Sequence, residues 1–239
     1  MSVENEHTAC AKSLCRGHAG GYPESFVSTP AESNIAIARR IAHPPGFEAF
    51  PSAADWAAAP PVEFSSDWRG ENHDPERRTE VRLLWSPQTL YLHFTAKYRV
   101  LTVFADSDPN GRRDQLWDRD VAEAFLQPPG SAPRHYKEFE VSPNGLWIDL
   151  DIAPGEKRDL HSNLRRRAAI DEAAKVWRAE LAIPMTCLVQ SFDPSAEWRA
   201  NFLRVEGPSE PRFYSAWNPT MTQQPNFHVP EAFGCLVFK

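Results

Sequence analysis

From Thr79 to the C-terminus, apolar and polar residues alternate in short segments, which is the pattern of half-buried β-strands. Roughly ten such segments follow one another, separated by turn signals such as Ser86-Pro87-Gln88 and Asn144-Gly145. No long helical period lies between them, so the pattern favours a sandwich or barrel over a parallel α/β sheet. We therefore predict an all-β fold, an antiparallel β-sandwich with few short helices.

The alternation also predicts which side chains form the core, because residues two apart on a strand face the same side of the sheet. In the segments where the period is strictest, apolar residues occupy one set of positions and polar residues the other. The residues predicted to face inward are Leu90, Leu92, Phe94, Phe139, Val141, Ile148, Leu150, Leu181 and Ile183.

Charge and composition exclude several classes of protein. The chain has 26 Lys and Arg residues against 32 Asp and Glu residues, and this excess of acids gives no general electrostatic reason to bind nucleic acid. Hydrophobic residues make up 41% of the chain, which rules out wholesale disorder. No apolar run approaches the ~18–20 residues that cross a bilayer, so we expect no membrane span. The sequence leaves the oligomeric state open.

Residues 1–34 differ from the rest of the chain because they show no hydrophobic periodicity. We interpret them as an N-terminal tail or arm, and residues 35–239 as the β-sandwich. Within the tail, the spacing H-x2-C-x4-C-x2-H offers zinc-type ligands. The alternative is an accidental spacing in a mobile tail. The residues of this pattern are His7, Cys10, Cys15 and His18.

The N-terminus lacks the basic start and apolar stretch that mark a secretory signal. We therefore expect a cytoplasmic protein whose cysteines are free thiols, with no disulfide framework. Cys235 lies in the apolar run FGCLVF and is expected to be a buried core residue.

Motifs for nucleotide binding, serine hydrolysis and zinc proteolysis are missing: the sequence contains no G-x-G-x-x-G, G-x-x-x-x-G-K-S/T, G-x-S-x-G or H-E-x-x-H. Paired acids are present, since Glu138 and Glu140 lie two residues apart on one predicted strand. Glycoside hydrolysis uses two carboxyl groups about 5–10 Å apart, which this pair could satisfy. The alternative is that these acids simply form the solvent face of the strand.

Glu123 lies in the segment VAEAF, where both faces of the predicted strand are otherwise apolar. A glutamate in such a place needs a partner or a ligand, because burying an unpaired charge is costly. One interpretation is a buried glutamate paired with an arginine such as Arg204. The other is a glutamate that binds a ligand.

Four tryptophans, Trp56, Trp68, Trp117 and Trp217, fall in predicted loops or at strand ends. Trp56 is expected to enter a groove from one helical turn in SAADWAAA. Loop tryptophans beside carboxylates are typical of a sugar site, where the flat ring covers the apolar face of a pyranose and polar side chains bind its hydroxyls.

Several motifs together resemble a known family. LWDRDVAEAFL, YKEFEVSPNGLWIDL, VWRAELAIP, FLRVEG, FYSAWNPT and FHVPEAFGCLVF occur in the order seen in family 9-like carbohydrate-binding modules of the DOMON-like group. The resemblance covers residues 35–239 and implies a jelly-roll-like β-sandwich without catalytic activity. In well-understood members, two tryptophans hold a mono- or oligosaccharide at a chain end. Carried over by motif, the site residues are Trp117, Glu123, Asn144 and Trp217.

The resemblance also allows for structural calcium, whose ligands the sequence does not identify. A haem-binding or redox-partner domain of the same fold is the alternative function, and a glycoside-processing enzyme is a third. In the DOMON-like group, haem is held by Met, His or Lys as axial ligands. The available residues are Met185, Met221, His93, His135 and His228.

Overall fold

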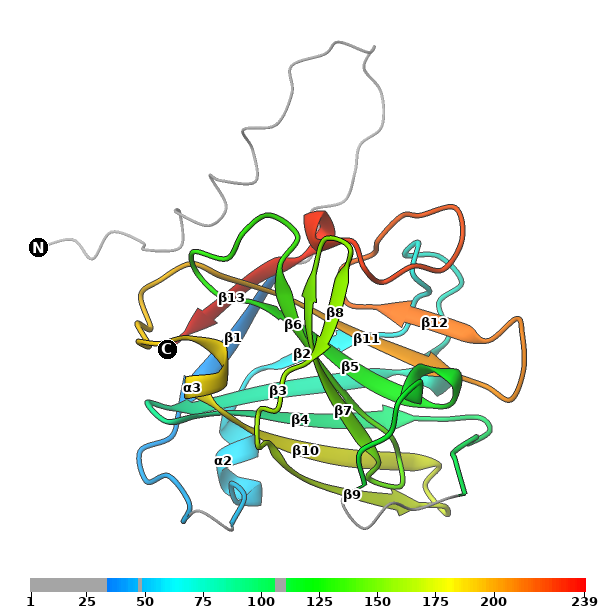
Figure 1. The fold of residues 1–239 in the computed structure, drawn as a ribbon. Helices are drawn as coiled ribbons and strands as arrows, with labels where there is room; N and C mark the ends of the chain where they lie inside the picture. The colour runs from blue at the N-terminus through cyan, green and yellow to red at the C-terminus, as the bar shows by residue number, and fades with distance from the viewer. Residues whose placement is uncertain (1–33, 47–48, 106–110) are drawn as a thin grey trace, which may run out of the picture. The chain divides into compact units, whose positions relative to one another are not determined.

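The computed structural model describes residues 34–46, 49–105 and 111–239, and residues 35–239 form one compact unit. Within these residues thirteen strands join into one curled sheet (Figure 1). Apart from Asn34, the predicted N-terminal tail lies outside the described residues, and so do His7, Cys10, Cys15 and His18.

The sheet can be followed from one edge to the other through eleven strands. A further strand, β12 (Phe213–Ala216), pairs with β11, and β2 (Pro61–Phe64) pairs with β3. The order along the main path is β8 (Glu156–Asp159), β7 (Trp147–Ala153), β6 (Tyr136–Val141), β5 (Val121–Gln127), β11 (Trp198–Glu206), β13 (Gly234–Phe238), β1 (Ile35–Arg40), β3 (Thr79–Ser86), β4 (Thr89–Lys97), β10 (Val176–Pro184) and β9 (Arg165–Asp171).

The all-β prediction is confirmed, but the sheet is not wholly antiparallel. Strand β1 runs parallel to both of its neighbours, β13 and β3, while the other pairs are antiparallel. Strands joined by a short hairpin must be antiparallel, whereas β1 is separated from β3 by a long connection that imposes no direction. The alternation of residues indicates that a strand forms, and it carries no information about this direction.

Helical structure in the described residues is confined to short segments, and no helix among them is long and apolar enough to span a membrane. Helix α2 (Ala53–Ala58) begins at Ser52, whose side chain exchanges capping hydrogen bonds with Asp55. It buries Trp56 as the sequence predicts. The other helical segments are α3 (Met185–Leu188), η1 (Pro75–Arg77), η2 (Leu116–Asp118) and η3 (Pro230–Ala232).

The sheet curls so that its two halves enclose the main core. Leu92 in β4 and Leu181 in β10 belong to the same buried cluster as Phe139 in β6 and Phe202 in β11. All nine side chains predicted to face inward are at most 2% exposed. Ile148 and Leu150, however, lie in a second apolar cluster on the outer face of the β5–β6–β7 half.

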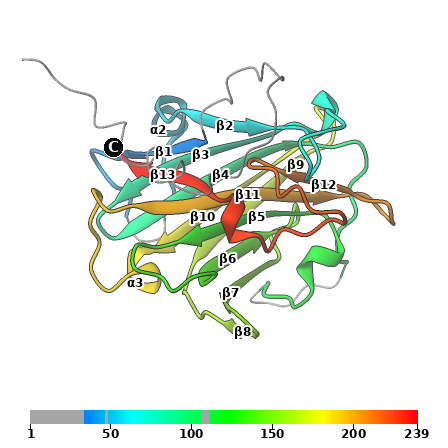
Figure 2. The ribbon, with the colours of Figure 1, turned by 90° about the horizontal axis from the view of Figure 1, so that it is seen from above.

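The second cluster exists because this outer face is covered. Residues 218–233, here called the covering segment, run alongside β11 and β5 (Figure 2) and bring Phe227 and Phe233 onto the face. Asn201 in β11 holds the start of this segment: its Nδ2 donates to the Asn218 carbonyl at 2.9 Å, and its Oδ1 accepts from the Asn218 N–H at 2.9 Å. Strands in this half are therefore buried on both faces.

Asn201→Ala is expected to lower the free energy of unfolding by about 1–3 kcal/mol, because backbone groups of Asn218 and Phe202 would lose their partners inside the protein. Urea denaturation measures the loss. Gln223→Ala, an exposed position in the covering segment, is the matched control and should change stability by less than about 0.5 kcal/mol. Equal effects of the two substitutions would contradict the anchoring role of Asn201.

The cysteines depart from expectation at one position. Cys235 in β13 is buried, in agreement with its apolar surroundings, but it is disulfide-bonded. The prediction of a free thiol is therefore wrong for Cys235. Cys187 in α3 is free and half-buried, and burial raises the pKa of its thiol to about 12.

Candidate functional site

A cavity of about 220 Å³ opens on the outer face of β5 and β6, beside the covering segment. It joins three kinds of side chain that rarely occur together: buried acids, aromatic rings and cations. The acids are Glu123, Glu138 and Glu140, the aromatic residues are Trp117, Tyr214, Phe227 and His228, and the cations are Lys157 and Arg212.

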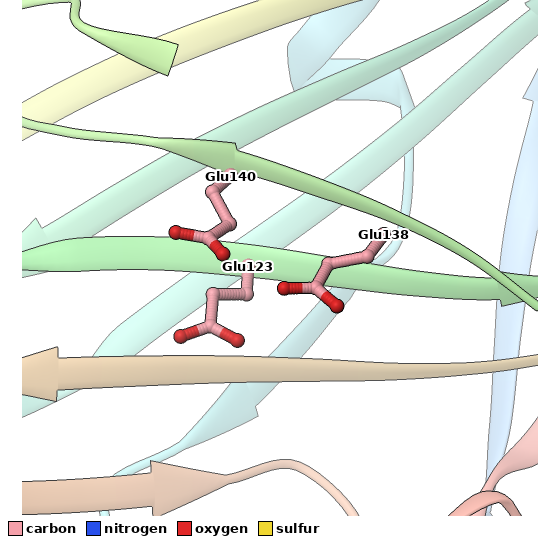
Figure 3. A group of neighbouring side chains, drawn as sticks. All are labelled: Glu123, Glu138 and Glu140. Carbon is pink, nitrogen blue, oxygen red and sulfur yellow. The ribbon is translucent and has the colours of Figure 1, made fainter. Parts of the chain in front are cut away.

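Strand register brings the acids together. Glu123 in β5 lies directly opposite Glu140 in β6, and Glu138 lies two residues away on the same face of β6. One oxygen of each carboxylate falls within 4.8 Å of the others (Figure 3). We call Glu123, Glu138 and Glu140 the glutamate trio.

The trio is buried and short of partners. Glu123 and Glu138 are 3% exposed, and Glu140 is completely buried. Four oxygens, Glu123 Oε1, Glu138 Oε2 and both oxygens of Glu140, have no hydrogen-bond partner outside the trio among the described residues. Buried carboxylates without partners are costly. The arrangement is therefore complete only with added protons, a cation or a ligand that donates hydrogen bonds.

Electrostatics agree with this geometry. Burial raises the pKa of Glu123 well above its usual range, and the neighbouring Glu138 raises it further. Burial is also the largest cause of the raised pKa of Glu140, followed by the charges of Glu123 and Glu138. Glu123 and Glu140 therefore hold protons at a pH where an exposed glutamate has lost its own.

The two cations of the lining are engaged with other groups. Arg212 donates to Glu210 Oε1 at 2.9 Å, to the Trp117 carbonyl at 2.7 Å and to the Tyr214 hydroxyl at 2.8 Å. The Lys157 ammonium lies 4.2 Å from the centroid of the Trp117 ring. Among the described residues, neither cation forms an ion pair with the trio.

The interpretation of Glu123 as the partner of Arg204 is wrong. Arg204 lies opposite Ala122, one position away from the pairing of Leu203 with Glu123, so its side chain leaves the other face of the sheet. Its guanidinium instead forms an ion pair with Glu206 at 2.9 Å. Glu123 is left facing the cavity.

Aromatic contacts fix the walls of the cavity. Tyr214 and Phe227 pack edge to face with ring centroids 5.9 Å apart, and Trp68 packs against Tyr214 at 6.4 Å. His228 stacks on Phe125 at 5.5 Å. Ring positions held by such contacts are in place before any ligand arrives, which lowers the entropic cost of binding.

Two of the predicted site residues, Trp117 and Glu123, line this cavity together. Asn144 lies outside its lining, in the turn between β6 and β7. There its Nδ2 donates to the Phe104 carbonyl at 2.9 Å and its Oδ1 accepts from the Ser142 hydroxyl. These bonds are typical of an amide that stabilises a turn.

Trp217 also lies outside the lining of the cavity. Its ring packs on Phe202, with centroids 5.6 Å apart, and Phe202 belongs to the main core on the opposite face of β11 from Leu203 and Glu123. The structure thus brings Trp117 and Glu123 together and places Tyr214 and Phe227, rather than Trp217, on the same cavity. The roles of Asn144 and Trp217 in binding remain predictions from the resemblance.

Glu138 and Glu140 do not form a solvent face, because the covering segment buries their side of the strand. The signal that could have identified them is the pairing of YKEFE with VAEAF across the sheet, which sets acids of both strands on one face. Tyr214 and Phe227 carried no comparable signal, since Tyr214 is placed by the pairing of β12 with β11 and Phe227 by how the covering segment folds back.

The residues considered for haem contact different parts of the fold. Met185 lies in the main core, Met221 is exposed, His93 packs against Trp56, His135 bonds to Asp151 and His228 lines the cavity.

The calcium that the resemblance allows fits the trio poorly. Calcium takes about six to eight oxygen ligands. The trio supplies carboxylates, but much of the remaining lining is aromatic or cationic and offers no oxygen to a metal. We therefore assign no role to calcium in this cavity.

Comparison with known proteins identifies relatives of this chain. A family model described as carbohydrate-binding family 9 matches residues 67–238. A curated relative, an extracellular protein from Arthroderma benhamiae, is 26% identical over 182 residues, covering 69% of this chain and 80% of that protein.

Solved structures share the fold. A putative carbohydrate-binding protein from Bacteroides uniformis is 19% identical with a TM-score of 0.70, and the match covers 87% of this chain and 100% of that one. A family 9 module from Caldicellulosiruptor kristjanssonii in complex with glucose is 16% identical with a TM-score of 0.58, covering 86% of this chain and 95% of that one. A family 9 module from the same organism in complex with cellotriose is 15% identical with a TM-score of 0.57, covering 86% of this chain and 93% of that one.

Proposed function

Because the chain belongs to carbohydrate-binding family 9, whose members are non-catalytic binding modules, we propose that it binds the end of a sugar chain in the cavity formed by Trp117 and the glutamate trio. One observation carries this proposal. A single cavity joins an aromatic ring face to buried carboxylate oxygens that lack partners. A sugar ring has both surfaces that this combination requires, an apolar face and a rim of hydroxyl donors.

Each part of the cavity has a distinct task in this proposal. The Trp117 ring removes the apolar face of one sugar ring from water, while Glu123 and its neighbours accept hydrogen bonds from the hydroxyls. The cavity volume of about 220 Å³ is below the ~300 Å³ of most small-molecule pockets, which suits a chain end better than a long stretch of polymer.

The resemblance and the cavity lining assign different residues to the second wall of the site. The resemblance assigns a second tryptophan, Trp217, to this role. The cavity itself is lined by Tyr214 and Phe227, whose edge-to-face packing makes a fixed aromatic surface. We assign the second wall to Tyr214 and Phe227.

Titration calorimetry with glucose and cellotriose tests the site, since these are the sugars named for the Caldicellulosiruptor kristjanssonii complexes. The parent chain should bind at least one of them. Trp117→Ala should cost about 2 kcal/mol or more, a loss of affinity beyond tenfold. Glu123→Gln should also weaken binding, by about 1 kcal/mol, because the amide replaces one acceptor oxygen with an NH₂ donor.

Two further variants serve as comparisons. Glu172→Gln changes an exposed acid in the turn between β9 and β10 and should bind like the parent. Trp217→Ala tests the residue that the resemblance assigns. Circular dichroism confirms that each variant is folded. Parental affinity in folded Trp117→Ala and Glu123→Gln, or a loss confined to Trp217→Ala, would contradict the proposed site.

A further inference from the structure

We propose that the preferred ligand of this cavity carries an ammonium group, so that the module selects an amino sugar such as glucosamine over a neutral hexose. The inference rests on the proposed sugar site and adds the chemical class of the sugar. It follows from the charge balance of the lining and from the unpartnered oxygens of Glu140.

The trio places more hydrogen-bond acceptors in one part of the cavity than a neutral sugar needs. Its carboxylates lie within 4.8 Å of one another, and Glu140 is completely buried with both oxygens lacking a partner outside the trio. Hydroxyl donors of a neutral hexose could occupy these oxygens but would not pair with the negative charge that a carboxylate gains when it loses its proton. A buried charge is stable only when it is paired.

In the described part of the chain, neither Arg212 nor Lys157 forms an ion pair with the trio, and His228, whose Nδ1 lies 3.9 Å from Glu138 Oε2, pairs with it only when protonated. Arg212 forms an ion pair with Glu210, with Nε and Oε1 separated by 2.9 Å, and its other nitrogens donate to the Trp117 carbonyl and the Tyr214 hydroxyl. The Lys157 ammonium lies over the Trp117 ring. Glu123 and Glu140 therefore stay neutral by holding protons, and an entering cation would replace those protons and pair with the carboxylates.

An ammonium group suits the trio in both charge and hydrogen-bonding capacity. It has three N–H donors and no acceptor, whereas the trio presents only carboxylate oxygens. Hydrogen bonds with charge on both partners are about twice as strong as neutral ones. Aromatic faces in the lining also attract cations, as the position of Lys157 over Trp117 already illustrates.

The same cavity is less suited to a bare metal ion. Its volume of about 220 Å³ exceeds what an ion needs, since one water molecule occupies only about 30 Å³. The Trp117, Tyr214 and Phe227 rings would contact nothing in a metal complex. An ammonium attached to a sugar ring uses both the acids and the aromatic walls.

Calorimetry with three sugars of nearly the same shape tests the inference. Glucosamine, glucose and N-acetylglucosamine differ at one substituent, which is a cation only in glucosamine at about pH 6.5. Glucosamine should bind more than about tenfold more tightly than either neutral sugar, as expected from at least one charged hydrogen bond. The ratio of glucosamine to glucose affinity should fall towards one in Glu140→Gln and stay unchanged in Glu172→Gln.

The outcomes separate this inference from the proposed function. Binding of glucose equal to or tighter than that of glucosamine would overturn the inference and leave the sugar site standing. Absence of binding by any sugar would overturn both. Tight binding of Ca²⁺ alone that Glu140→Gln removes, without preference for glucosamine, would assign the trio to a metal and overturn the inference.

Discussion

Arg204→Ala is expected to lower the free energy of unfolding by about 3–5 kcal/mol, because it leaves a buried carboxylate without its main partner. Arg204 and Glu206 have side chains that are each 1% exposed, and they form an ion pair at 2.9 Å. The guanidinium also donates to the carbonyls of Arg77 and Lys97, which tie β11 to the end of η1 and the end of β4. Urea denaturation of the parent and the variant measures the difference.

A matched substitution on the surface shows whether burial is the cause. Arg178 is exposed on β10, so Arg178→Ala should change the free energy of unfolding by less than about 0.5 kcal/mol. A loss below about 1 kcal/mol in Arg204→Ala would contradict the account, since an exposed ion pair is worth no more than that.

Glu140→Gln is expected to stabilise the ligand-free protein, and the gain should grow with pH. Burial, followed by the charges of Glu123 and Glu138, raises the pKa of Glu140 in the folded state. A carboxyl group whose pKa is higher in the folded state contributes to the free energy of unfolding. This contribution is fully present below the pKa of about 4.3 in the unfolded state, and it is lost as the pH rises towards the pKa in the folded state. An uncompensated buried charge costs roughly 3–5 kcal/mol, so we expect a gain of about 3 kcal/mol in alkaline solution.

Thermal or urea unfolding between about pH 5 and pH 9 checks this behaviour, with the parent and Glu140→Gln measured in parallel. The positive charge of Lys157 opposes the rise in the pKa of Glu140, and that of Arg212 opposes the rise in the pKa of Glu123. Both cations are therefore kept in the two proteins that are compared. Glu172→Gln, an exposed acid, should follow the parent at every pH. A Glu140→Gln variant that is less stable than the parent at high pH would contradict the description of the trio.

Strand formation could be predicted from the sequence because it depends on local alternation. Leu92, Phe94 and Leu181 lie in the core as their period requires. The direction of β1 could not be predicted, because parallel pairing arises from a distant connection. Ile148 and Leu150 show the same limit: their burial was predictable, while the cluster they join depends on the covering segment.

Some residues of the candidate site could likewise be predicted from the sequence, and others could not. Glu123 stood out because an acid on an apolar strand needs a partner, and Trp117 because its motif resembles a binding family. Glu138 and Glu140 had two interpretations that only the register with β5 and the covering segment resolves. Tyr214 and Phe227 reach the cavity through long-range packing, for which a single sequence offers no local signal.

The central claim is that a sugar end occupies the cavity between Trp117 and the glutamate trio, and a crystal structure of the chain with cellotriose tests it most directly. The account predicts a terminal sugar ring stacked on Trp117, with a hydroxyl oxygen within about 3.2 Å of a Glu123 carboxylate oxygen. A sugar bound at another surface, with Trp117 and Glu123 untouched, would contradict it.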